Sequence, residues 1–258
     1  MRGFLAGEPG ISDRCEEYFD RKGKVAVTAV DVTGAAQALA GGHLSGPTSA
    51  YFLARACAAA ALLGAETSEK DETVILQMKC TGPLGGFNVE CTAEGTLRGY
   101  TEKKTLEGFD GLGTPDPKLV LGDRQIQVTR SIPGKILSQG ISNSLDGYLA
   151  GSLQRKAVIY TAAELTDDVT VRFARGLMIE VMPDSAASIA DYGEDFDFSG
   201  FELRRVRPLR FACRCSPDRA LAMLAALPES EKANLPESLD ITCHMCGRTF
   251  TVKTKPQS

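Results

Sequence analysis

Two closely spaced cysteine pairs near the carboxyl end constrain what this 258-residue chain can fold into more than any other feature. The first pair is Cys213 and Cys215, the second is Cys243 and Cys246, and 27 residues lie between the pairs. Residues two apart in an extended strand point to the same side, so Cys213 and Cys215 share a face. Two thiolates from each pair can then surround one Zn²⁺ as a tetrahedron with bonds of about 2.3 Å. The spacing predicts a zinc site with these four cysteines as its ligands.

The residues around the second pair favour a tight turn that presents both sulfur atoms. Gly247 follows Cys246 and supplies the backbone freedom that such a turn needs. We expect this knuckle to join two short strands, at 240–243 and 249–252. Between the two pairs, Ser216 and Pro217 predict the start of a short helix. Fewer than fifty residues have too little core to fold alone, and a structural metal normally makes up that shortfall.

The two histidines are weaker ligand candidates than the cysteines. His244 lies inside the knuckle, but an imidazole is not needed once four thiolates are available. His43 stands alone among glycines, and we expect it to have a structural role. Four incidental buried thiols, or a metal that only staples the fold, are the alternatives to a functional zinc site.

The composition is that of a globular protein: 43% of the residues are hydrophobic and 24% are charged. A net charge of −4 argues against non-specific binding of nucleic acid, which a basic field favours. Gly34 to Ala54 is uncharged, but its polar residues and glycines disfavour transfer into a membrane. Glu8 and Pro9 come before an apolar run of signal-peptide length can form. We therefore expect a soluble, cytoplasmic protein with no membrane partner.

Up to residue 182, strand-like and helix-like segments alternate, which predicts an α+β core at 1–182. The expected strands are 24–32, 73–80, 87–93, 125–130, 169–173 and 177–182. The expected helices are 48–63 and 143–163, and residues 81–86 are expected to form a hairpin loop. These hairpin signals favour an α+β layer architecture over a doubly wound sheet.

Residues 183–210 differ from this core because an acidic run precedes a basic one. The acidic residues do not fit the spacing of a calcium-binding EF-hand loop. With few aliphatic residues, the segment is expected to be a solvated linker between the core and a zinc-binding domain at 211–258. The acidic run comprises Asp191, Glu194, Asp195 and Asp197, and the basic run comprises Arg204, Arg205, Arg207 and Arg210.

No catalytic motif stands out, and we expect the chain not to be an enzyme. The chain lacks a phosphate-binding G-x-x-x-x-G-K-[ST], a G-x-S-x-G elbow and an H-E-x-x-H helix. Cys57, Cys80 and Cys91 are expected to be small core residues. Cys15 lies beside two glutamates and is expected to be exposed, with its thiolate disfavoured by their charge.

Together with the two cysteine pairs, Gly82-Pro83-Leu84-Gly85-Gly86 and Arg98-Gly99-Tyr100 resemble the redox-regulated 33 kDa heat-shock chaperonin family. The resemblance covers about Val25 to Val252. It implies a core with a C-terminal zinc switch, and a protein that holds unfolding clients without ATP and dimerises when active. It also implies that oxidation joins Cys213 to Cys215 and Cys243 to Cys246, releases zinc, and unfolds the switch and the linker. The linker is longer in most family members than the one here.

The chemistry of such a switch follows from general principles. A sulfenic acid on one thiol is intercepted by a neighbouring thiol, so close pairs form disulfides. Forming either disulfide removes two of four ligands and most of the apparent binding free energy of roughly 10–16 kcal/mol. We predict an oxidation-activated chaperone of the holdase type.

Three alternatives stay open. One is a constitutive chaperone with a zinc staple, and another is an unrecognised enzyme with a zinc-stapled domain. The third is a zinc-ribbon-like nucleic-acid-binding protein that uses Arg204, Arg205, Arg207, Arg210 and Arg214.

Overall fold

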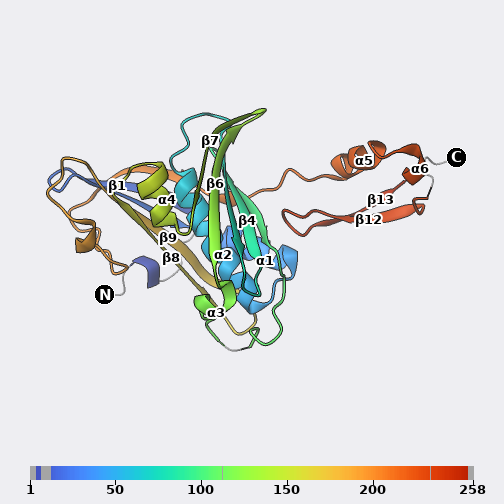
Figure 1. Cartoon of the computed structure of the whole chain (residues 1–258), viewed down its shortest axis with the longest axis horizontal. Coiled ribbons are helices and arrows are strands. Elements are labelled where there is room, and N and C mark those ends of the chain that lie inside the picture. Colours follow the sequence, from blue (N-terminus) through green and yellow to red (C-terminus); the bar gives the residue numbers. More distant parts are fainter. Residues whose placement is uncertain (1–3, 7–12, 112, 233, 255–258) are drawn as a thin grey trace.

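Two sheets and the helices packed against them form the body of the molecule, from which a small hairpin extends together with the short helices α5 and α6 (Figure 1). The computed structural model describes residues 4–6, 13–111, 113–232 and 234–254. Helices and strands are mixed along the chain, and almost every neighbouring pair of strands is antiparallel. The predicted α+β class is confirmed.

The first sheet has the strand order β10-β1-β2-β9-β8 and is antiparallel throughout. Its strands are β1 (Arg14–Asp20), β2 (Val25–Asp31), β8 (Ala157–Leu165), β9 (Val171–Val181) and β10 (Glu202–Pro208).

The second sheet has the order β11-β5-β4-β3-β6-β7, and β11 is parallel to β5. Its strands are β3 (Thr73–Cys80), β4 (Gly86–Thr92), β5 (Thr96–Thr101), β6 (Arg124–Ile132), β7 (Lys135–Ser142) and β11 (Arg210–Phe211). A separate hairpin near the C-terminus consists of β12 (Ser238–Thr242) and β13 (Thr249–Lys253).

The central helix α2 contacts strands of both sheets, and this explains its composition. It begins at Pro47, which is preorganised for the first helical position, and runs to Gly64, one residue beyond each end of the predicted helix 48–63. Fifteen of its 18 residues are buried, so it needs apolar residues on all sides and small ones where a sheet comes close. The other helices are α1 (Thr33–His43), α3 (Pro117–Leu121), α4 (Leu145–Ser152), α5 (Pro217–Ala225) and α6 (Glu229–Lys232), with 3₁₀ turns at Phe4–Ala6 and Ile189–Asp191.

The predicted hairpin of β3 and β4 is confirmed. β3 has the predicted bounds, β4 begins one residue early, and the two pair through residues 73–79 and 86–92. Phe87, Val89 and Cys91 are buried, as their alternation indicated, and they pack in the main core beside α2.

The helix expected over residues 143–163 is wrong in its second half. Only Leu145–Ser152 is helical, and residues 157–165 form β8, which pairs along the whole of β9. β9 is continuous where two separate strands were expected. Gly176 lets β9 pass close to α2, because a Cβ at this position would lie 2.8 Å from a Leu62 side-chain carbon of α2.

The solvated linker expected over residues 183–210 is also wrong for much of its length. β10 pairs with β1 and extends the first sheet. Before it, Phe196 is buried, and its ring centroid lies 4.9 Å from that of Phe198 and 5.0 Å from that of Phe201. This aromatic cover packs on one face of the first sheet, against Val25, Val27, Ala29, Leu177, Ile179 and Val181. The aromatic side chains supply the apolar surface that the aliphatic content did not reveal.

Cys15 was expected to be exposed, and the structure contradicts this: it is 1% exposed. β1 has a strand on each side, and the Cys15 side chain packs in the main core. Burial raises the pKa of this thiol to about 11. Cys57 and Cys91 are buried as expected, whereas Cys80 is partly exposed.

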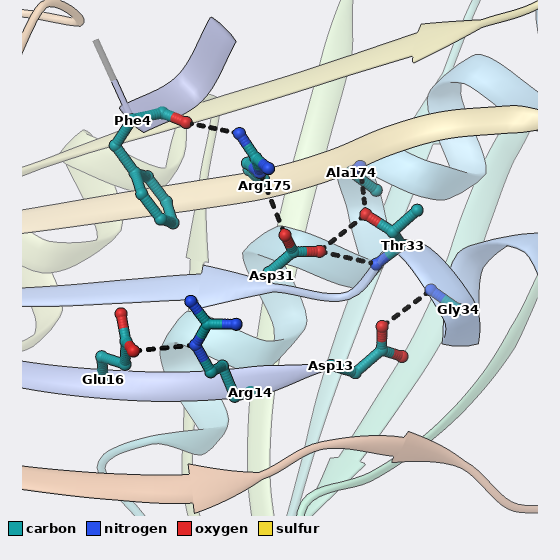
Figure 2. Close-up of polar contacts among 9 residues, drawn as sticks. All are labelled: Phe4, Asp13, Arg14, Glu16, Asp31, Thr33, Gly34, Ala174 and Arg175. Atoms are coloured by element: carbon teal, nitrogen blue, oxygen red, sulfur yellow. Dashed lines mark hydrogen bonds and ion pairs between the residues drawn. The ribbon is translucent and has the colours of Figure 1, made fainter. Parts of the chain in front are cut away.

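Two aspartates fix the start of α1 to the first sheet (Figure 2). Asp13 accepts a hydrogen bond of 2.7 Å from the Gly34 backbone N–H, and Asp31 accepts one of 3.1 Å from that of Thr33. Both carboxylates lie where a helix leaves N–H groups unpaired and favours negative charge. Arg175 of β9 forms an ion pair of 3.0 Å with Asp31, and both residues are buried. The position of α1 is therefore set by strands of the first sheet.

Within the described parts of the chain, none of the helices combines the length and the apolar character that crossing a membrane would require.

Candidate metal centre

The first cysteine pair follows β11, which is held on an edge of the second sheet. β11 pairs in parallel with the beginning of β5. Immediately beyond it, the Ala212 N–H donates a 3.1 Å hydrogen bond to the Leu97 carbonyl oxygen. Cys213 and Cys215 therefore leave the sheet edge from a fixed point.

The second pair lies in the turn between β12 and β13, as predicted. The Cys243 carbonyl accepts hydrogen bonds from the N–H groups of Cys246 at 3.3 Å and Gly247 at 2.9 Å. Gly247 has φ +73°, the left-handed conformation that glycine adopts without a Cβ penalty. The turn is closed by a 2.8 Å bond from the Cys243 N–H to the Arg248 carbonyl.

The fold brings the four predicted sulfur atoms together. All four lie within 4.8 Å of one another, with 3.8 Å between those of Cys213 and Cys243 and 3.5 Å between those of Cys215 and Cys246. Four sulfurs bound to one ion at about 2.3 Å would be about 3.8 Å apart. A disulfide would bring two of them to about 2.05 Å, so the thiols are free. The residues fit a single tetrahedral metal ion.

The surroundings of Cys213 favour its charged form. Burial alone would raise its pKa, but interactions of the sulfur with the Cys215 backbone, the neighbouring thiols and the Arg98 guanidinium lower its pKa to about 7. Arg98 also forms an ion pair of 2.6 Å with Glu90. A thiolate is the form that binds a metal. Burial raises the pKa of Cys215 and Cys246 instead, so Cys213 is the one of these three thiols whose thiolate the surroundings favour. Sequence reasoning did not predict this role of Arg98, since the contact forms only in the folded chain.

Neither histidine joins the four sulfurs in the described cluster. His43 is buried at the end of α1, and its Nε2 lies 2.8 Å from the Gly99 carbonyl oxygen. The His244 ring packs on Tyr100, with 3.8 Å between the ring centroids. Both side chains contact the protein itself, in agreement with the expected structural role of His43.

Four of the five arginines proposed for nucleic-acid binding lie near acidic side chains. Such pairs lower the positive potential that a phosphate backbone would need. The pairs are Arg204–Glu202 at 2.9 Å, Arg207–Glu17 at 3.4 Å, Arg210–Glu94 at 3.8 Å and Arg214–Glu90 at 4.0 Å. The structure gives the nucleic-acid hypothesis no support.

We define the metal module as residues 213–254. Of its described residues, only Ala220, Cys246 and Val252 are buried. Helix α5 begins as predicted, with the Ser216 hydroxyl accepting a 3.2 Å hydrogen bond from the Arg219 N–H. The four cysteines themselves pack against the main core. The sulfur cluster is thus the joint between a large core and a module with little core of its own.

Known proteins share both parts of this architecture. The family model described as Hsp33 protein matches residues 13–196 and 193–253. The 33 kDa chaperonin of Synechococcus sp. (strain JA-3-3Ab) is 26% identical over 273 residues, which cover 90% of this chain and 84% of that protein. The 33 kDa chaperonin of Thermus thermophilus is 25% identical over 275 residues, covering 89% of this chain and 81% of that protein.

A solved structure shares the fold. The crystal structure of the 33 kDa chaperonin from Thermotoga maritima matches with a TM-score of 0.79 and 18% identity, over 94% of this chain and 95% of that one. Since the family model covers nearly the whole chain, including the core and the four cysteines, this chain belongs to the Hsp33 family.

Proposed function

We propose that this protein is a cytoplasmic, ATP-independent chaperone that holds unfolding proteins and is activated when its zinc-binding cysteines are oxidised. The observation that carries the proposal is the position of four free thiols, all within 4.8 Å, at the joint between the core and the metal module. Its relatives are named chaperonins, a role that needs no catalytic residues. We propose no enzymatic activity.

Zinc is the metal we propose, because four thiolates in a tetrahedral arrangement suit it. Zn²⁺ supplies a binding free energy that becomes folding free energy of a small module, with apparent values of about 10–16 kcal/mol in zinc-finger peptides. The chain contributes Cys213 and Cys215 from the arm after β11, and Cys243 and Cys246 from the knuckle. Together these ligands connect the module to the edge of the second sheet.

Oxidation by hydrogen peroxide would convert these ligands into disulfides. One thiolate attacks peroxide and becomes a sulfenic acid, with hydroxide leaving and taking up a proton as water. A neighbouring thiol then displaces the sulfenic oxygen as a second water, forming the disulfide. Following the family resemblance, we propose the pairs Cys213–Cys215 and Cys243–Cys246. A disulfide sulfur no longer binds the metal as a thiolate, so the module loses its main source of stability.

We propose that clients bind to the face of the first sheet that lies beneath the aromatic cover. Phe196, Phe198 and Phe201 lie on an apolar face of this sheet, and β10 leads from them to β11 and Cys213. Loss of the metal frees the C-terminal end of this segment. Release of the segment would expose Val25, Val27, Ala29, Leu177 and Ile179, which we propose as a binding surface for apolar segments of unfolded clients. By resemblance, we propose that the active form is a homodimer.

The test combines zinc content with light scattering of an aggregating client, before and after peroxide. We expect the reduced protein to hold zinc and leave aggregation unchanged, and the oxidised protein to release zinc and suppress aggregation. Thiol reductant with added zinc should reverse both. Equal suppression in both states would indicate a constitutive chaperone, and unchanged aggregation after full zinc release would refute the chaperone proposal. Cys80→Ser, which changes a cysteine outside the cluster, is the control and should behave as the unmodified protein.

A further inference from the structure

The outer edge of β5 holds both arms of the metal site. β5 pairs with β4 on one side. On the other side, the Leu97 carbonyl accepts the Ala212 N–H, and the Gly99 N–H donates a 3.0 Å hydrogen bond to the Met245 carbonyl. Backbone groups of residues two apart point to the same edge of a strand, so Leu97 and Gly99 share this edge. One strand edge therefore bonds first the arm before Cys213 and then the knuckle.

The end of α1 completes the contact through two glycines. A Cβ on Gly42 would lie 2.5 Å from the Cys246 carbonyl oxygen, and one on Gly247 would lie 1.9 Å from the Gly42 carbonyl oxygen. The two backbones can approach this closely only because neither residue has a side chain. Next to them, His43 reaches the Gly99 carbonyl with its Nε2 at 2.8 Å.

Three consecutive residues of β5 each contact the metal module. The Arg98 guanidinium lies near the Cys213 sulfur, on which its positive charge acts. Gly99 bonds the Met245 carbonyl, and the Tyr100 ring packs on His244 with 3.8 Å between centroids. Cys246 is 2% exposed and belongs to the main core cluster. These contacts make an interface between the core and the knuckle.

We propose that Gly42, His43, Gly99 and Tyr100 form a docking surface, the knuckle seat, whose partner is this chain's own metal-bound knuckle, residues 243–247. The seat is the route by which the core senses whether the metal is bound. The inference rests on the proposed metal binding, but not on client binding, because it concerns hydrogen bonds within the chain.

The knuckle needs the metal in order to dock. Its carbonyl groups at Met245 and Cys246 face the seat only while the turn keeps its shape and position. Few residues of the module are buried, so the sulfur cluster is the main constraint on that position. Without a metal holding Cys243 and Cys246 to the first arm, the knuckle leaves the seat and the Gly99 N–H loses its partner.

Hydrogen exchange at the Gly99 amide tests the seat directly in the full-length reduced protein, with no client present. Removing zinc with a chelator should speed this exchange by roughly fivefold or more, as expected for the loss of a backbone hydrogen bond. Amides of α2 should keep their protection. Unchanged protection of Gly99 after zinc removal would overturn the proposal, and this measurement requires no variant.

Gly42→Ala provides an independent test with a matched control. Alanine is the best helix former, so α1 is preserved, but its methyl group would strike the Cys246 carbonyl. In zinc-loaded Gly42→Ala we expect fast Gly99 exchange and faster loss of zinc to a chromophoric chelator. Gly41→Ala changes the neighbouring glycine, whose added Cβ would have only the Gln37 amide nitrogen nearby, at 3.9 Å, and should match the unmodified protein. An exchange rate at Gly99 in Gly42→Ala equal to that of the unmodified protein would refute the seat. The proposed function is tested separately, because it would be refuted by client aggregation that is unchanged after zinc release.

Discussion

Helices α2 and α5 begin in the same way but depend on different sources of stability. Each starts with a proline at the first helical position after an extended residue. α2 then buries 15 of its 18 residues between two sheets, whereas in α5 only Ala220 is buried. Burial of apolar surface contributes about 25 cal/mol per Å², so α2 is held by its own side chains. α5 has too little buried surface for this and depends on the sulfur cluster of its module.

The cysteines of the two regions differ in the same way. Burial raises the pKa of Cys91 to about 12, and it also raises that of Cys57. In the metal module, hydrogen bonds lower the pKa of Cys213 to about 7 despite burial. Burial also raises the pKa of Cys215 and of Cys246, so Cys213 is the one of these three thiols whose charged form is favoured, whereas the core thiols Cys57 and Cys91 are kept neutral. Residue type alone does not distinguish the two roles, but environment does.

The largest effect should come from removing one sulfur of the cluster. Cys243→Ser should abolish tight zinc binding and unfold the metal module, because the module loses most of an apparent zinc-binding free energy of about 10–16 kcal/mol that stabilises its fold. Zinc content after dialysis and hydrogen exchange of residues 213–254 measure this, and the core amides should be unaffected. A variant that kept both its zinc and its module protection would break the distinction between the two regions.

The next largest difference between the core and the metal module should come from shortening one leucine in each. Leu53 in α2 is fully buried, and Leu53→Ala should destabilise the core by about 2–5 kcal/mol. Leu221 in α5 is 40% exposed, and Leu221→Ala should change the free energy of unfolding by less than about 1 kcal/mol. Urea denaturation of the zinc-loaded proteins gives both values. Equal effects would mean that α5 is supported by burial after all.

Loss of the helix cap in the module should weaken metal binding moderately. Ser216→Ala removes the hydroxyl that accepts the Arg219 N–H, at a cost of about 1 kcal/mol. Because the module folds with its metal, this cost should appear as a lower zinc affinity in chelator competition. Ser144→Ala removes the corresponding cap of α4, in which the Ser144 hydroxyl accepts the Gly147 N–H, and should leave zinc affinity unchanged. An equal loss of affinity in both variants would contradict the account.

The smallest effect concerns the core at acid pH. Burial alone would raise the pKa of Glu72, but hydrogen bonds from Arg130 at 2.6 Å and from the N–H groups of Ser68 and Glu69 hold it below its ordinary value of 4.5. A carboxyl whose pKa is lower in the folded state stabilises the protein above its unfolded pKa. That contribution is lost as the pH falls from 4.5 through the folded pKa.

In Glu72→Gln this part of the acid destabilisation should be absent, so core stability measured by urea denaturation should fall less steeply below pH 4.5. Glu164→Gln, at an exposed ion pair with Arg172, should keep the slope of the unmodified protein. Parallel slopes for Glu72→Gln and the unmodified protein would show that Glu72 does not contribute.

Local signals predicted the elements whose stability is local or periodic. β4 lies within one residue of its predicted bounds because the strict alternation of its sequence matches its one buried face. The four-sulfur cluster was predicted because the cysteines of each pair are close in sequence. Cys213 and Cys215 share a face of an extended segment, and Gly247 favours a turn after Cys246. Most of α2 was predicted, since a run rich in Ala and Leu that follows Pro47 and ends at Gly64 fits a helix better than a strand.

What the sequence did not predict depends on pairing between distant segments. β8 was assigned to a helix, although Val158, Ile159, Tyr160 and Thr161 are strand-forming residues, and its pairing with β9 completes the strand. β10 contains four charged residues among seven, and only its partner β1 makes it a strand. The knuckle seat joins Gly99 to Met245, which no spacing rule connects. The motif Arg98-Gly99-Tyr100 indicated the family but not its contacts.

Zinc removal from the reduced protein, followed residue by residue through hydrogen exchange, tests the central claim most directly. The account predicts about one zinc ion per chain, as expected for a single four-thiolate site. On chelation, protection should be lost across residues 213–254 and at Gly99, while α2 and β3 stay protected. If the fully reduced protein contains no metal, or keeps the same protection in residues 213–254 after its metal is removed, the account is contradicted.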